Sequence, residues 1–185
     1  MKAPFSLFGT LCLCFLLFCS SCGETEHTFC SLPANFAVTT VYAVPPLYTS
    51  LNSMGEFCTI RAANNGYLFS HPSIESYTLP KTALSNYSGF YLGLSGFIVG
   101  LPNIPELGYD QSRVVCFDLA CSNCYNDFNI TKRMELQESG KAFCPSCKRT
   151  YNLNARGEVC NGEAGHSLFR YRVSYVGDTM LISNR

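Results

Sequence analysis

Two C-x-x-C pairs constrain this chain more than any other feature of its 185 residues. They are Cys121 with Cys124 and Cys144 with Cys147, and 19 residues separate the pairs. Two residues between thiolates let one tight loop supply two ligands, and two facing loops complete the four ligands at about 2.3 Å that a tetrahedral ion needs. The spacing therefore predicts a metal site. Because four Cys leave no open position for water, we expect a structural or electron-carrying site rather than a hydrolytic one.

Disulfide bonding is the alternative interpretation of the same residues. The chain holds 12 Cys, and an exported protein meets an oxidising environment in which thiols pair. Cys30, Cys58 and Cys160 are further candidates for such bonds, although their connectivity does not follow from sequence. Cys116 stands on an apolar strand and is expected in the core. A thioredoxin-like redox pair is not expected, since neither C-x-x-C is predicted to open a helix in a βαβ unit.

The N-terminus has the pattern of a bacterial lipoprotein leader. Lys2 is the only charged residue before Glu24, and residues 5–18 are almost wholly apolar. This run is too short to span a bilayer as a helix of about 20 apolar residues. Two serines precede Cys22, as in a lipobox, so we expect cleavage before Cys22 and acylation of its thiol. Under the alternative, an ordinary signal peptide is removed and Cys22 has no role.

These features predict the organisation of the chain. Residues 1–21 form a lipoprotein signal peptide, residues 22–31 a tether, and residues 32–185 a single domain. The metal-binding subdomain is expected over about 116–160. The mature protein is then lipid-anchored in the bacterial cell envelope, on its periplasmic or surface face, with Cys22 as the lipid anchor to the membrane.

Charge and motif content exclude several classes of function. Thirteen basic and thirteen acidic residues give a formal net charge of zero, whereas a nucleic-acid binder that works by bulk electrostatics needs a basic excess. No Ser–His–Asp or Cys–His constellation and no phosphate-binding glycine loop marks a catalytic site. The sequence therefore predicts no catalytic residues, and at most an electron-transfer activity.

Hydrophobic patterning predicts an all-β fold. β-Branched and aromatic runs at 36–44, 57–61, 97–99, 113–119 and 131–137 predict strands, as does the alternating run at 168–176 before a turn and a last strand at 180–182. Shorter stretches before Cys144 and at 150–153 predict two more. One helical turn is expected within 48–54, and residues 67–94 are expected to be irregular. No segment sustains a 3.6-residue apolar period for three turns, so long helices are not expected.

The C-terminal half resembles the Rieske-type iron–sulfur domain family. In that family a strand leads into the first ligand pair, and a second pair is followed by an aromatic residue, glycine-containing segments and a further strand. The matching stretches are 96–99, 115–121, 143–147, 151–153, 157–159, 162–164 and 168–171. The resemblance covers about 90–185 well and 32–90 only by general β character. It implies a Rieske-like antiparallel β-sandwich with a small metal-binding subdomain of two C-x-x-C loops at one tip.

The sequence departs from the Rieske pattern at the ligands. A Rieske cluster takes two His on one iron and two Cys on the other, but Cys124 and Cys147 stand at the His positions, with Cys124 one residue late. The three His of the chain lie at no ligand spacing, and His166 is expected in an exposed loop. The resemblance therefore implies a single Zn or Fe ion held by four Cys thiolates, with an all-Cys [2Fe–2S] cluster as a further alternative.

Together these observations predict a membrane-anchored lipoprotein with a Rieske-like domain. Its metal is either a structural zinc, or an iron or iron–sulfur centre that passes electrons to an envelope partner. Zinc is favoured because Tyr125 and Lys148, not Gly, follow the second Cys of each pair, and such Gly let backbone N–H groups turn towards sulfur. Lys148 and Arg149 are expected to offset the charge of four thiolates. The alternative is a disulfide-bonded, metal-free envelope lipoprotein that serves as a binding or structural subunit.

Overall fold

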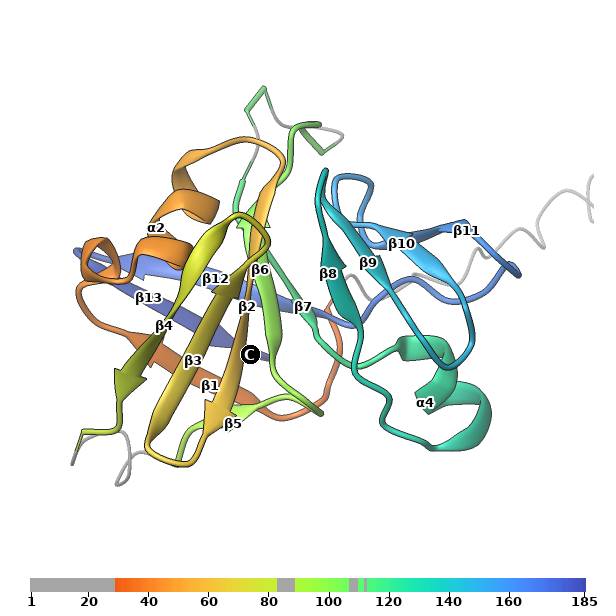
Figure 1. Ribbon diagram of the computed structural model, residues 1–185, viewed down its shortest axis with the longest axis horizontal. Helices are drawn as coiled ribbons and strands as arrows, with labels where there is room; N and C mark the ends of the chain where they lie inside the picture. The colour runs from red at the N-terminus through yellow and green to blue at the C-terminus, as the bar shows by residue number, and fades with distance from the viewer. Residues whose placement is uncertain (1–28, 83–88, 107–109, 112) are drawn as a thin grey trace, which may run out of the picture.

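The computed structural model describes residues 29–82, 89–106, 110–111 and 113–185; the predicted signal peptide, Cys22 and most of the tether lie outside them. Two antiparallel sheets make up the described chain (Figure 1). The large sheet has the order β4 (Ile74–Pro80), β3 (Gly66–His71), β2 (Glu56–Ala63), β6 (Phe97–Leu101), β7 (Val115–Asp118), β12 (Arg170–Val176), β13 (Thr179–Ser183), β1 (Ala34–Val38) and β5 (Tyr91–Leu92). The small sheet has the order β11 (Glu158–Asn161), β10 (Thr150–Asn152), β9 (Lys141–Phe143) and β8 (Glu135–Gln137).

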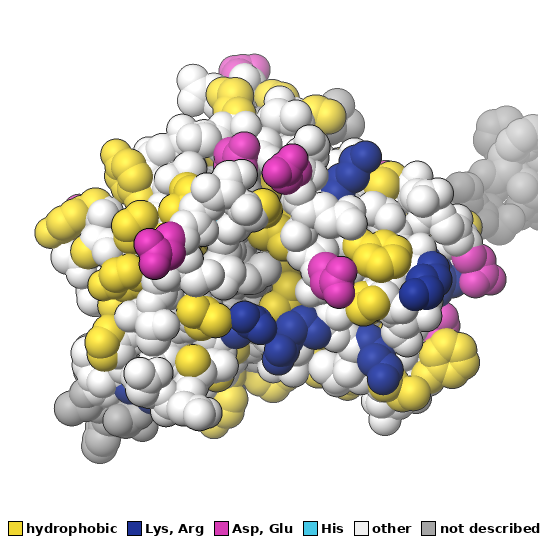
Figure 2. Space-filling view, in the orientation of Figure 1, with side chains coloured by type: hydrophobic (Ala, Val, Ile, Leu, Met, Phe, Trp, Pro, Cys, Tyr) yellow, Lys and Arg dark blue, Asp and Glu magenta, His cyan; other side chains and the backbone are white. Residues whose placement is uncertain are grey.

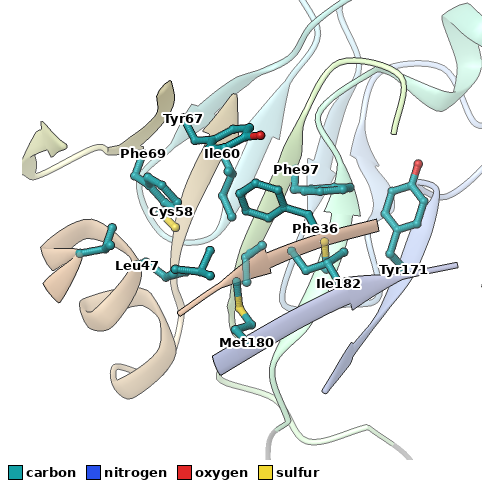
Figure 3. Close-up of a cluster of buried hydrophobic side chains, with 14 of the residues drawn as sticks. Phe36, Leu47, Cys58, Ile60, Tyr67, Phe69, Phe97, Tyr171, Met180 and Ile182 are labelled. Atoms are coloured by element: carbon teal, nitrogen blue, oxygen red, sulfur yellow. The ribbon is translucent and has the colours of Figure 1, made fainter. Parts of the chain in front are cut away.

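The large sheet curls over itself to enclose the main core. Phe36 on β1 packs edge-on against Tyr67 on β3, with 4.8 Å between ring centroids, although five strands of the sheet order lie between β1 and β3. Figure 3 shows these rings together with Phe97 and Tyr171 between the two halves of the sheet. The helix α2 (Pro45–Asn52) covers one end of this core and inserts Leu47.

The central strands of the large sheet bury both faces, because a second core lies behind them. Phe97 and Val99 on β6 face the main core, whereas Ile98 between them packs into the second core with residues of the small sheet. On β7, Cys116 faces the main core and Phe117 faces the second core. This alternation follows the two-residue period of a strand and joins the two sheets into one packed body.

The fold confirms the all-β expectation in its coarse form: most elements are strands and all named pairs are antiparallel. The described helices are short, and none of them is long and apolar enough to span a membrane. Strands occur at each position where the sequence predicts one, and turns at 64–65, 138–140 and 154–157 separate neighbouring strands. The Rieske-like form of the sandwich and the domain boundaries remain expectations.

Three local predictions are wrong. Residues 67–94, expected to be irregular, contain β3, β4 and β5, because β4 is a half-exposed edge strand whose sequence carries no clear apolar alternation. The strand predicted over 36–44 ends at Val38 and continues into a 3₁₀ turn, Val41–Ala43. The following two prolines begin α2 rather than close a strand, since proline is tolerated in the first turn of a helix.

Basic and hydrophobic side chains gather on different parts of one face of the molecule. Figure 2 shows Lys and Arg side chains over the small sheet and at the seam between the sheets, while hydrophobic side chains gather over α2. The distribution agrees with the sequence, in which residues 121–185 carry nine basic and six acidic residues and residues 22–120 carry three and seven.

Candidate metal centre

The first cysteine loop turns directly into a helix. Cys121 follows β7 after two residues and is the N-cap of α4 (Ser122–Phe128), where its Sγ accepts a hydrogen bond from the N–H of Cys124 at 3.5 Å. A sulfur thus takes the place of the Ser or Asp oxygen that usually caps a helix. The first C-x-x-C therefore opens a helix. The strands that flank this helix, β7 and β8, belong to different sheets, so the unit is not βαβ, as expected.

The second cysteine loop is the tight connection between β9 and β10. Cys144 N–H donates to the carbonyl of Arg149, and Lys148 N–H donates to the carbonyl of Cys144, each at 2.9 Å. Lys148 adopts a left-handed backbone with φ of 62°, the conformation that Gly usually supplies. The N–H groups of residues 146 and 147 therefore face the Cys144 sulfur, and that of Arg149 faces the Cys147 sulfur. The argument from missing glycines therefore fails for this loop, since Lys148 adopts the backbone conformation that Gly would supply.

The two loops bring the four predicted sulfur atoms together. All four Sγ atoms lie within 4.8 Å of one another. Two of these separations join the loops: 3.5 Å from Cys121 to Cys147 and 3.7 Å from Cys124 to Cys144. A tetrahedral ion with metal–sulfur bonds of about 2.3 Å places its sulfur ligands about 3.8 Å apart. Three of the cysteines are buried and Cys147 is half-buried, so the four can hold one metal ion in an enclosed position.

A buried tyrosine, for which the sequence predicted no such role, supports the site from the small sheet. The Tyr151 hydroxyl lies 3.0 Å from the Cys121 sulfur and accepts a hydrogen bond of 2.8 Å from the Asn123 side-chain amide. Because its oxygen accepts from Asn123, its hydrogen is free to donate to sulfur. The ring has no exposed surface. Tyr151 therefore fixes the orientation of one ligand without being a ligand itself.

A third segment, 162–168, closes over the first loop. His166 N–H donates to the Asn123 side-chain oxygen at 2.8 Å, and its carbonyl accepts from the Asn123 amide at 2.9 Å. A Cβ on Gly165 would lie 2.1 Å from that same Asn123 oxygen, so only Gly permits this approach. His166 itself is exposed, as predicted. The sequence signal for this segment was its match to a glycine-containing stretch of the Rieske pattern.

Arg149 links the third segment to the second loop. Its guanidinium donates to the Glu163 carboxylate at 2.9 Å, its Nε donates to the Glu163 carbonyl at 2.8 Å, and 94% of its surface is buried. Lys148, also expected to balance thiolate charge, lies over the Phe143 ring, 5.9 Å from its centroid. Of these two cations, Arg149 is therefore the one held in place beside the sulfur atoms.

The surroundings separate the acidities of the thiols. Burial raises the pKa of Cys124 and of Cys144. Burial also opposes ionisation of Cys147, but hydrogen bonds from the backbone N–H and guanidinium of Arg149 outweigh it and lower the pKa of Cys147 to about 7. A metal ion binds the thiolate form, so Cys147 is the ligand best prepared to bind first.

The remaining singled-out cysteines lie apart from this centre. Cys116 is buried in the main core as predicted, and Cys58 is buried there too. Cys30 is half-buried and Cys160 is exposed. All eight cysteines that the structure describes are free thiols, so the disulfide interpretation finds no support among them. Cys22, the predicted lipid anchor, lies outside the described residues.

Fold and site together define the class: an antiparallel β protein with a buried four-cysteine site that can hold a metal ion. No protein-family model matches this chain, and a search of curated proteins found no match to it. Any more specific assignment therefore depends on the sequence pattern and on the geometry of the site.

Proposed function

We propose that this chain is a Rieske-like envelope lipoprotein whose four thiolates hold a single structural zinc ion. The observation that carries the proposal is the convergence of Cys121, Cys124, Cys144 and Cys147, with every Sγ within 4.8 Å of the others. In this role the ion joins the first loop to the second and thereby fixes the small sheet against the large one.

The sulfur separations favour one ion over a two-iron cluster. A [2Fe–2S] cluster binds two thiolates on each iron, and the second iron with its bridging sulfides holds the two ligand pairs apart. Here the sulfurs of Cys121 and Cys147 lie 3.5 Å apart, and those of Cys124 and Cys144 lie 3.7 Å apart. No sulfur of one pair lies more than 4.8 Å from a sulfur of the other pair. This spacing fits a single tetrahedral ion and leaves no room for a second.

The closure of the site favours a structural role. Four Cys complete a tetrahedral shell, which leaves no coordination position for water or substrate. Tyr151, Asn123 and the segment 162–168 cover the first loop, and Arg149 ties that segment to the second. Zinc carries no redox activity and suits such a closed tetrathiolate site.

Mononuclear iron is the second candidate, because specific contacts favour it. Hydrogen bonds to ligand sulfurs are one means by which proteins adjust the potential of an iron centre. The structure provides an N–H donor from Cys124 to Cys121 and a hydroxyl within 3.0 Å of the same sulfur, besides the N–H groups directed at Cys144 and Cys147. An iron centre here would pass single electrons to an envelope partner.

The membrane attachment belongs to the same proposal. The apolar run at 5–18 and the two serines before Cys22 support acylation of Cys22 and an anchored protein in a bacterial envelope. Phe29, the first described residue, follows Cys22 by seven positions, a distance of at most about 25 Å for extended chain. The β domain would therefore lie close to the bilayer surface.

The metal is tested on full-length protein purified from its own host without oxygen. Elemental analysis is expected to give about one zinc per chain, and Cys144→Ser to lose that metal. The matched control is Cys160→Ser, which changes an exposed thiol outside the site and should retain it. Stoichiometric iron, with a visible absorption that dithionite reversibly changes and a matching EPR signal, would replace the zinc assignment by electron transfer. Absence of both metals, with these four cysteines found in disulfides, would overturn the proposal.

The anchor is tested separately with Cys22→Ala in a bacterial host. We expect an uncut precursor and no acylated product, because the lipoprotein peptidase cuts before an acylated Cys. Processing and membrane attachment identical to wild type would remove the anchor from the proposal and leave the metal site unaffected.

A further inference from the structure

A cavity lined by arginines opens beside β12, separate from the cysteine site. Its volume is about 920 Å³. Five arginines contribute to its wall: Arg113, Arg156, Arg170, Arg172 and Arg185. They come from four parts of the chain, namely the segment before β7, the turn after β10, β12 itself and the C-terminal residue. The described lining contains neither the four cysteines nor the Tyr151, Asn123 and Arg149 side chains that support them.

The described lining has a large excess of positive charge. Glu106 is the one acidic side chain among the described lining residues, so the described lining side chains together carry a formal charge of +4. That carboxylate is already engaged in two parallel hydrogen bonds with Arg170, one of which measures 3.0 Å. The Nε of Arg170 is buried and has no hydrogen-bond partner among the described residues. Arginines gathered this closely repel one another unless an anion compensates them.

An aromatic wall accompanies the charges. The Phe29 ring lies under the Arg172 guanidinium, 4.5 Å from centroid to carbon, and under Arg170 at 5.4 Å. Stacking of this kind holds a guanidinium plane in one orientation and leaves its N–H edge available to a ligand. Tyr175 lines this cavity and also a second, more open pocket, whose wall includes Tyr42 and Tyr48. The two pockets together offer a cationic part and an aromatic part.

We propose that this cavity binds a phosphate-bearing ligand. The planar, forked donors of Arg match phosphate oxygens bidentately, and a phosphate group carries up to two negative charges where a carboxylate carries one. A charge of +4 therefore fits phosphate or diphosphate better than a single carboxylate. The volume lies within the range of about 300–1,000 Å³ that small-molecule sites occupy. A soluble phosphate ester and the headgroup of an anionic phospholipid share this chemistry.

The test uses the full-length protein and inorganic pyrophosphate as the probe in isothermal titration calorimetry at about 50 mM salt, where charge screening is moderate. Arg172→Gln and Arg156→Gln are each expected to weaken binding about tenfold, because each removes a charge-assisted hydrogen bond. Arg133→Gln is the matched control: it removes the same charge from an exposed strand-edge position outside this cavity and should leave the affinity within about twofold of wild type. Metal content and thermal unfolding show that each variant is folded.

A second arm distinguishes the two sources of phosphate. Flotation is compared on vesicles of phosphatidylcholine alone and of phosphatidylcholine with phosphatidylglycerol, so that any lipid anchor contributes equally to both. If wild type and Arg133→Gln prefer the vesicles with phosphatidylglycerol and Arg172→Gln does not, the result supports a lipid headgroup as the ligand. If pyrophosphate binds but no variant prefers phosphatidylglycerol, the result supports a soluble phosphate ester. Two results overturn the proposal: neither probe distinguishes wild type from Arg172→Gln, or succinate binds as tightly as pyrophosphate. Neither result bears on the metal centre, whose ion these variants retain.

Discussion

The two sheets of this molecule are stabilised in different ways. The core of the large sheet consists of fully buried aromatic and aliphatic side chains such as Phe36, Phe69 and Ile182, drawn from strands of up to eight residues. The small sheet consists of strands of three or four residues with mostly exposed side chains on its outer strands. Three site cysteines are themselves members of the second core. Buried apolar side chains fill the core of the first region, whereas the core of the second combines apolar side chains with the converging cysteines.

The difference between the two sheets indicates why a chain of this size would hold a metal ion. A domain of about 150 residues builds an adequate hydrophobic core without crosslinks. The small sheet contributes few apolar residues beyond Leu136, Ala142 and Tyr151, and it meets the large sheet chiefly through Phe57, Ile98 and Phe117. A metal ion adds stabilisation where such a sheet cannot add apolar area.

Removal of the metal is expected to have the largest effect, and to separate the two regions. Structural zinc contributes apparent binding free energies of about 10–16 kcal/mol in small zinc domains, which is comparable to the whole stability of a domain. Chelation should therefore expose amides of β8 to β11 while those of β2 and β6 stay protected. Hydrogen exchange with mass spectrometry measures this directly. Simultaneous loss of protection in both sheets would show that they form one cooperative unit, contrary to the comparison.

The converse experiment weakens the large sheet. Phe36 is completely buried, with the rings of Tyr67 and Phe90 at 4.8 and 5.2 Å between centroids. Phe36→Ala should lower the free energy of unfolding by about 3–5 kcal/mol, since it creates a cavity in a packed core. Urea denaturation measures the loss. Phe128→Ala is the control, because that ring is 67% exposed and its removal should cost less than about 0.5 kcal/mol. Metal loss from Phe36→Ala under native conditions would contradict the independence of the two regions.

A smaller change addresses the support of one ligand. Tyr151→Phe removes the hydroxyl that lies 3.0 Å from the Cys121 sulfur and deprives Asn123 of one acceptor. Loss of a partner at this distance from a ligand typically reduces metal affinity about 10–100-fold. Competition with a chromophoric chelator gives the affinity, and Tyr42→Phe, in which the ring is 63% exposed, is the control. Equal affinities in the two variants would make Tyr151 a packing residue only.

The sequence specified the sulfur site better than its surroundings. Four cysteines at C-x-x-C spacing can be recognised in the sequence, because the geometry of metal ligands depends on their local spacing. Tyr151 and Asn123 are 28 residues apart, and their contact depends on how the small sheet packs against α4, which no local pattern encodes. The left-handed backbone of Lys148 was missed for a different reason. Only Gly or Asn is expected at positive φ, and the hydrogen bonds of the loop overcome that preference.

The fold likewise contains elements that the sequence predicts and elements that it does not. Strands with both faces buried, such as β6 and β7, have continuous apolar runs that the sequence displays. The edge strand β4 alternates between half-buried and exposed residues and lacks this signal. The helix α4 consists of residues with poor helix propensity, and it forms where Cys121 caps it and its first turn supplies Cys124. Tertiary context determined both elements.

Asp118 lies where the two regions meet, and its substitution is expected to have the smallest effect. Its carboxylate accepts hydrogen bonds from Leu94 N–H at 2.8 Å, Tyr171 O–H at 2.7 Å and Ala120 N–H at 2.7 Å. It therefore joins the turn before β6 and the strand β12 to the segment that leads into Cys121. Asp118→Asn places an amide donor against one of these donors. The expected cost is about 1–3 kcal/mol, measured by urea denaturation. The control is Asp178→Asn, at an exposed position.

The pH dependence of that cost tests how the carboxyl group is held. Burial raises the pKa of Asp118 despite its three donors, so the folded state holds the proton more tightly than the unfolded state does. The resulting stabilisation is fully present below the unfolded pKa of about 3.9 and is lost as pH rises through the higher native pKa. Asn does not titrate, so wild type should exceed Asp118→Asn most at low pH, and the gap should narrow towards neutrality. A gap that widens with pH would mean that the three donors stabilise the charged carboxylate more than burial opposes it, and that Asp118 fastens the cysteine loop as an anion.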